Sequence, residues 1–228
     1  MRIALIPIHD PDVVLTDLGL AILAVYLGRR LWTEPGRGAL SKAGAVLLGG
    51  LASAAFWGAI FHAFFPADTA TFAGFVAWIP VVLSITVAAA TMLELALRIL
   101  MPRLAQRVRR TVVAAYAATF LAVVLLVDES FTSIVGFYVP ALILLLIAAG
   151  QQAIRDRSTG WALIGIGLTI SLGAALLQQA EVSIHPVYFD HNAVYHVVQG
   201  MALVVLYLGF RRVPEAPTSF RAAGSSSP

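Results

Sequence analysis

Cysteine is absent from this 228-residue sequence, and charged residues are scarce, at 12% of the chain. Without cysteine the chain can form neither a disulfide framework nor a thiolate metal site, so a bound metal would need histidine, carboxylate or amide ligands. Hydrophobic residues make up 60% of the sequence. A soluble globular domain of this size needs more polar surface than these figures leave, so the composition predicts a polytopic membrane protein.

Long stretches without charged residues mark the segments that can cross a membrane. A helix that rises 1.5 Å per residue needs about 20 residues to cross the hydrocarbon layer. The first stretch reaches this length only if it includes Asp17, which places a carboxyl group inside or at the edge of the membrane. We expect an all-α membrane protein, a seven-transmembrane helix bundle within residues 1–212, followed by a disordered tail over 213–228. The spans are expected at about 13–32, 42–65, 71–97, 109–127, 131–150, 159–179 and 192–210.

Basic residues are concentrated on alternate loops. Of the 15 Lys and Arg residues, 14 fall on the loops of one side, and only Arg2 falls on the other. By the positive-inside rule the basic side is cytoplasmic, so the N-terminus is expected outside and the C-terminus in the cytoplasm. Attraction to anionic lipid explains these basic loops, so we expect membrane lipids and not nucleic acid as partners. The short loops and the lack of cysteine indicate a bacterial inner (cytoplasmic) membrane.

All five histidines are expected on the outer side of the bundle. Asp17 in the first span and Gln178 and Gln179 at the end of the sixth lie at a similar depth. Because ionisable groups inside membranes are usually functional, we expect an outward-facing polar pocket formed by spans one, two, six and seven. For His62, which phenylalanines flank, the alternative is a place in an interfacial aromatic belt. The histidines are His9, His62, His185, His191 and His196.

Helical spacing groups the polar residues at the start of the seventh span. Asn192 and His196 are four residues apart and share a face, and Gln199 follows three residues later. His191 points away from His196 on a regular helix, so it is expected to join them only if the first turn is unwound. Asp190 is well placed to cap the start of this helix.

Two motifs and the expected topology resemble the CREST superfamily of seven-transmembrane hydrolase-like proteins, which includes alkaline ceramidases and adiponectin-receptor-like proteins. In that group one histidine lies late in span two and an HxxxH pair opens span seven. Here Phe61-His62-Ala63-Phe64-Phe65 looks like the span-two motif. Asn192-Ala193-Val194-Tyr195-His196 looks like the span-seven motif, with Asn192 where the first histidine should stand.

The resemblance implies a zinc ion held by histidines, whose bound water attacks an amide of a lipid-like substrate. It implies that His62 and His196 bind the zinc, with Asn192, His191 or His185 completing the ligand set. Asp17 or Asp68 is then expected to orient a histidine or to act as general base. The alternative is a non-catalytic bundle in which Asp17 and the span-seven residues form a buried polar network for helix packing or small-ligand binding.

Overall fold

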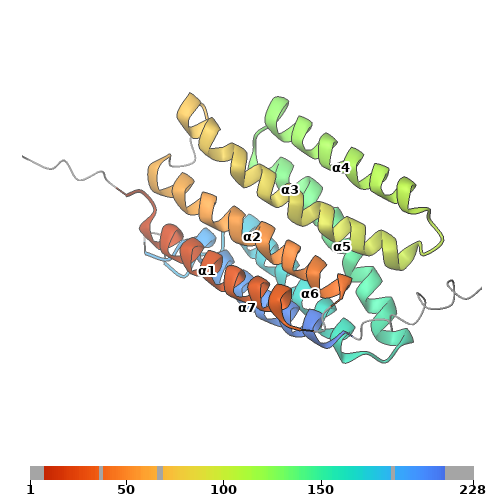
Figure 1. Cartoon of the computed structure of the whole chain (residues 1–228). Coiled ribbons are helices and arrows are strands. Elements are labelled where there is room, and N and C mark those ends of the chain that lie inside the picture. The colour runs from red at the N-terminus through yellow and green to blue at the C-terminus, as the bar shows by residue number, and fades with distance from the viewer. Residues whose placement is uncertain (1–7, 36–37, 66–68, 186–187, 214–228) are drawn as a thin grey trace, which may run out of the picture.

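The computed structural model describes residues 8–35, 38–65, 69–185 and 188–213, and within these ranges the chain is all-helical. The prediction of an all-α bundle is confirmed, because all seven helices are long and apolar enough to cross a membrane. The expected disordered tail falls, from residue 214 onward, outside the described residues. The helices are α1 (Pro11–Thr33), α2 (Ala39–Phe64), α3 (Phe72–Leu100), α4 (Gln106–Leu126), α5 (Phe131–Arg155), α6 (Thr159–Gln179) and α7 (His191–Arg212) (Figure 1).

Four helix starts are fixed by a side-chain cap. At the start of α7 the Asp190 carboxylate accepts a hydrogen bond from the backbone N–H of Ala193 at 2.9 Å, as the sequence predicts. Such a bond satisfies one of the backbone donors that the first helical turn leaves unpaired. The side chains of Thr71, Ser130 and Ser158 cap α3, α5 and α6 in the same way.

Six of the seven helices close into a ring. Neighbours around it are α1, α2, α3, α5, α6 and α7, and α7 packs back against α1. The remaining helix, α4, packs only on α3 and α5 within the described residues and lies at the edge of the bundle (Figure 1). Its buried side chains are Phe120 and Val124. The six-helix ring is therefore the part of the fold that can enclose a site.

The two ends of the ring differ in charge and in packing. At the acidic end, where α1, α3, α5 and α7 begin, the described loops carry Asp and Glu but no Lys or Arg. At the basic end α2 crosses to α7, where a methyl group added to Gly44 would lie 2.6 Å from the ring of Phe210. Gly209 brings α7 equally close to Ile164 of α6. Close packing therefore fills the ring at its basic end and leaves its acidic end free to hold a cavity.

Candidate functional site

A cavity of about 570 Å³ lies inside the acidic half of the six-helix ring. All six ring helices contribute to its lining, so the expected pocket of spans one, two, six and seven is extended by α3 and α5. The reason is that these two helices close the ring opposite α1 and present apolar and aromatic residues that the sequence pattern assigns to an ordinary core. Trp78, Ile134 and Tyr138 are among them. The walls are mainly apolar, with polar groups confined to a few positions.

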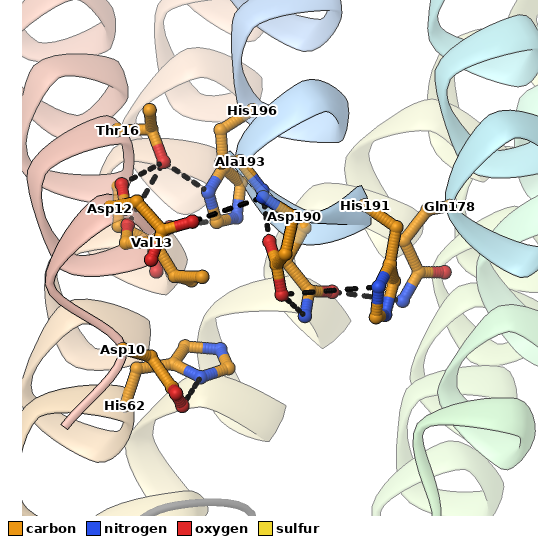
Figure 2. Close-up of polar contacts among 12 residues, drawn as sticks. Asp10, Asp12, Val13, Thr16, His62, Gln178, Asp190, His191, Ala193 and His196 are labelled. Atoms are coloured by element: carbon orange, nitrogen blue, oxygen red, sulfur yellow. Dashed lines mark hydrogen bonds and ion pairs between the residues drawn. The ribbon is translucent and has the colours of Figure 1, made fainter. Parts of the chain in front are cut away.

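His196 is the centre of the polar contacts in the cavity. Its Nε2 lies 3.1 Å from Oδ1 of Asp17, and its Nδ1 lies 3.0 Å from the hydroxyl of Thr16. Both partners come from α1, so the imidazole joins the first helix to the last (Figure 2). His196 is 8% exposed and Asp17 is 3% exposed, which makes this contact part of the interior.

The hydrogen atoms available limit how His196 can be paired. The Thr16 hydroxyl has one hydrogen, which it can donate either to Nδ1 or to the backbone carbonyls of Asp12 and Val13, at 2.9 and 3.0 Å. A neutral imidazole with its hydrogen on Nε2 donates to Asp17 and accepts from Thr16. An imidazolium donates to both. A neutral imidazole with its hydrogen on Nδ1 donates to Thr16 and accepts from a protonated Asp17. In each of these forms both ring nitrogens are in use.

Four buried polar atoms on four different helices have no hydrogen-bond partner among the residues that the structure describes. They are Asp17 Oδ2, Trp78 Nε1, Ser171 Oγ and Gln199 Nε2. All four residues line the cavity. Each lies six or eight residues from the acidic end of its helix, which corresponds to a depth of about 9 to 12 Å at 1.5 Å per residue. The cavity therefore has a layer of unsatisfied donors and acceptors at one level.

The space beside the Asp17 carboxyl group depends on a glycine. A methyl group added to Gly58 of α2 would lie 3.0 Å from Oδ2 of Asp17, closer than an ordinary van der Waals contact. Gly58 itself lines the cavity. Because Gly58 has no side chain, the neighbouring helix α2 does not crowd Oδ2 of Asp17.

Two more of the polar residues proposed from the sequence, His62 and Asn192, line the same cavity but make separate contacts. His62 lies with its Nδ1 3.9 Å from a carboxylate oxygen of Asp10 (Figure 2). Asn192 accepts from the Gln178 amide at 3.2 Å and donates to Asp190 at 3.3 Å. His62, Asn192 and His196 all line the cavity.

His191 does not have the unwound first turn that it is expected to need in order to join His196. It lies at the first position of a regular α7, with Nδ1 3.9 Å from Asp190, and still lines the cavity. On a helix with 100° between residues, Gln199 points about midway between His191 and His196. The cavity that Gln199 faces is therefore lined by both histidines, although their rings diverge.

The described side chains are not assembled into a zinc site in this arrangement. Among the residues that the structure describes, no group of three or more His, Asp or Glu side chains could hold a metal ion. A zinc-bound imidazole keeps one nitrogen for the metal, whereas both nitrogens of His196 face α1. His185, which is also expected as a third zinc ligand, is not among the cavity lining residues. It accepts a hydrogen bond from the backbone N–H of Tyr188 at 3.2 Å and packs against the Tyr188 ring. Asp68 lies outside the described residues.

The loop between α4 and α5 contributes to the cavity lining at the acidic end. Asp128, Glu129 and Ser130 line the cavity together with Thr69, whose hydroxyl donates to Glu129 at 2.9 Å. The Ser133 hydroxyl and the backbone N–H of Ser130 donate to Asp128 and hold the pKa of its carboxyl group below the ordinary value of 3.8. Asp128 is therefore ionised at neutral pH.

Two residues of the cavity, and Thr16 beside it, escape the sequence reasoning. Ser171 and Trp78 sit within apolar spans, where a single hydroxyl or indole is common in any helix. Thr16 is missed because its partner is 180 residues away. A usable signal was their depth: Thr16, Trp78 and Ser171 lie at nearly the same distance from the acidic ends of their helices as Asp17.

Residues 13–215 match the sequence family described as "Family of unknown function (DUF6962)". The match extends over most of the chain. The chain belongs to the DUF6962 family. No curated protein and no solved structure matches this DUF6962 member. The resemblance to the CREST superfamily therefore stays a prediction, and the function of this DUF6962 protein has to be argued from its cavity.

Proposed function

We propose that this protein binds a small amphipathic ligand in the cavity at the acidic end of the six-helix ring. The observation that carries the proposal is that four residues lining one largely apolar cavity each hold a buried polar atom without a partner, at one level of the bundle. A buried donor or acceptor without a partner costs about 1–3 kcal/mol. A ligand with polar groups at that level can pair with these atoms, and its apolar remainder can pack against the apolar lining.

The size of the cavity supports this proposal. Ligand pockets are usually clefts of about 300–1,000 Å³, lined mainly by apolar side chains with a few placed polar groups. The cavity has about 570 Å³ and this kind of lining. It is also enclosed by helices from both ends of the chain, which hold the polar groups in fixed positions.

We propose further that the acidic end faces the outside of the cell membrane and the basic end faces the cytoplasm. The distribution of the 15 Lys and Arg residues supports this orientation. A ligand would then reach the cavity from the extracytoplasmic side or from the outer half of the bilayer. We propose the inner membrane of a bacterium, because the loops are short and the chain lacks cysteine.

The binding test uses a neutral fluorescent amphiphile, a dansyl group joined by an octyl chain to a terminal hydroxyl, and purified protein in phosphatidylcholine nanodiscs. Energy transfer from tryptophan to dansyl is expected to saturate. Ala175→Phe, which adds a ring to the cavity wall on α6, is expected to abolish the saturable part. Ala162→Phe, on an exposed face of the same helix, is the matched control and is expected to bind like the wild type. Transfer that never saturates, or that survives Ala175→Phe, contradicts the proposal.

A zinc-dependent amide hydrolase is the second candidate. It is supported by the fact that His62, His191, Asn192 and His196 line one cavity. It requires His196 to exchange one of its α1 contacts for the metal. The test is metal analysis of detergent-purified protein: about one zinc per chain, lost in the His62→Ala/His196→Ala double variant, supports the hydrolase. Zinc-free protein that remains folded and binds the fluorescent amphiphile supports the binding proposal alone.

A further inference from the structure

The cavity is lined by acidic side chains and not by basic ones among the described residues. Asp17, Asp128 and Glu129 line it, and no Lys or Arg does so among the described residues. The loops and the first turn of α1 at the same end add further acids, including Asp10, Asp12 and Asp190, again without a described basic residue. A cleft lined by charges of one sign in a low-dielectric surround concentrates ligands of the opposite sign.

Asp17 is the buried member of this set. Its side chain is 4% exposed, and its only polar contact among the described residues is Oδ1 with His196. Oδ2 is buried and has no partner among the described residues, and Asp17 itself lines the cavity. With a neutral imidazole that accepts from Thr16, the carboxylate has no cation to pair with. Buried charges are costly unless they are paired and hydrogen-bonded.

From these observations, and resting on the proposed ligand-binding function, we propose that the cavity selects amphiphiles whose head group is a positively charged amine. The ammonium group binds Oδ2 of Asp17, and the apolar body lies against the walls that α3 and α5 provide. A carboxylate or phosphate head at this position would face Asp17 without any basic side chain to offset the repulsion.

An ammonium head group has the donors that Oδ2 lacks. An ammonium ion donates up to three hydrogen bonds, so it can bind Oδ2 and still reach a second acceptor. Gly58 keeps the space beside Oδ2 free, because a methyl group there would lie 3.0 Å from the oxygen. At the acidic end, ionised Asp128 and the neighbouring Glu129 line the same cavity as Asp17.

The experiment compares three probes that differ only in their terminal group. Each has a dansyl group and an octyl chain, and the chain ends in a primary amine, a hydroxyl or a carboxylate. Binding is measured by energy transfer from tryptophan in nanodiscs of pure phosphatidylcholine, with empty nanodiscs subtracted. We expect the amine to bind at least about tenfold more tightly than the hydroxyl, because a hydrogen bond to a buried charge has this magnitude, and the carboxylate to bind most weakly.

Asp17→Asn keeps the shape of the side chain and removes its charge. It is expected to lower the affinity for the amine probe to that of the hydroxyl probe, while the hydroxyl probe binds about as before. Should Asp17→Asn not fold, Gly58→Ala tests the same point, because it crowds Oδ2. Gly49→Ala on the same helix, which meets no atom within 4 Å, is its control. Gly58→Ala is expected to weaken the amine probe selectively, and Gly49→Ala to leave it unchanged.

The outcomes separate the two proposals. Saturable binding of all three probes with equal affinity, or a preference for the carboxylate, overturns the amine selectivity and leaves the binding function in place. An amine preference that persists in Asp17→Asn also overturns it, because the charge at position 17 is then not its source. If no probe binds saturably, the proposed function itself is wrong.

Discussion

Thr16 is expected to hold His196 in place, and Thr16→Val tests this with the smallest change of shape. The substitution removes the hydroxyl that lies 3.0 Å from Nδ1 of His196 and keeps the branched side chain. The lost bonds from Thr16 to the carbonyls of Asp12 and Val13 are local to α1. The contact with His196 is the one that joins α1 to α7.

The expected loss of stability follows from what is known of such contacts. Hydrogen bonds between transmembrane helices contribute on average about 0.6 kcal/mol and at most about 1.7 kcal/mol. A ring nitrogen left without a partner in the interior adds a cost, so we expect Thr16→Val to destabilise the protein by about 0.6–2 kcal/mol. For a chain of this size each kcal/mol lowers the unfolding temperature by about 2–4 °C, so the expected decrease is about 1–8 °C.

The assay is thermal unfolding in detergent, read as a double-mutant cycle with His196→Leu. If Thr16 acts through His196, the two substitutions are non-additive and their coupling free energy accounts for most of the Thr16→Val effect. Thr86→Val is the matched control, because the Thr86 hydroxyl makes the same kind of bond to a backbone carbonyl, Val82 at 2.8 Å, and has no other partner among the described residues. Additive effects for Thr16→Val and His196→Leu, within about 0.5 kcal/mol, would refute the reasoning.

Three further predictions concern packing, charge and orientation. Gly44→Ala is expected to lower the unfolding temperature, because the new methyl group would lie 2.6 Å from the Phe210 ring and overpacking costs about 1–3 kcal/mol. Gly49→Ala meets no atom within 4 Å and is expected to be neutral or stabilising. The pKa of the Asp128 carboxyl group, followed by NMR of its carboxyl carbon, is expected to lie below 3.8, and Ser133→Ala is expected to raise that pKa toward 3.8. The hydrogen bonds from Ser133 and Ser130 are therefore fully present at neutral pH and are lost in acid. Equal titration in the wild type and in Ser133→Ala contradicts this. Because the chain has no cysteine, a single introduced cysteine reports on which side of the membrane its position lies. A membrane-impermeant maleimide on intact cells is expected to label Ser183→Cys at the acidic end but not Ala105→Cys at the basic end. The reverse labelling pattern would invert the proposed topology.

Much of the fold could be predicted from the sequence because charge and helix length constrain membrane spans strongly. The seven helices overlap the expected spans, and most extend beyond them by a few residues, since a helix does not stop where the hydrocarbon ends. Asp17 was rightly included in the first span. The shared face of Asn192, His196 and Gln199 also follows from helical spacing, and all three residues line the cavity.

The arrangement of the helices could not be predicted in this way. Hydropathy is similar for spans inside and outside the ring, so nothing marks α4 as the excluded helix. The contact of His196 with Thr16 and Asp17 joins residues about 180 positions apart, and it depends on how α7 packs on α1. The sequence could place His62 and His196 at one depth, but their separate partners, Asp10 for one and Asp17 for the other, follow only from the packed structure.

The position of α4 outside the ring has a consequence for how this family can vary. No described lining residue of the cavity comes from α4, and its few buried side chains touch only the outer faces of α3 and α5. Substitutions in α4 that preserve its apolar character are therefore expected to accumulate freely among DUF6962 sequences. Positions such as Asp17, Gly58 and His196 are expected to change rarely, or to change together.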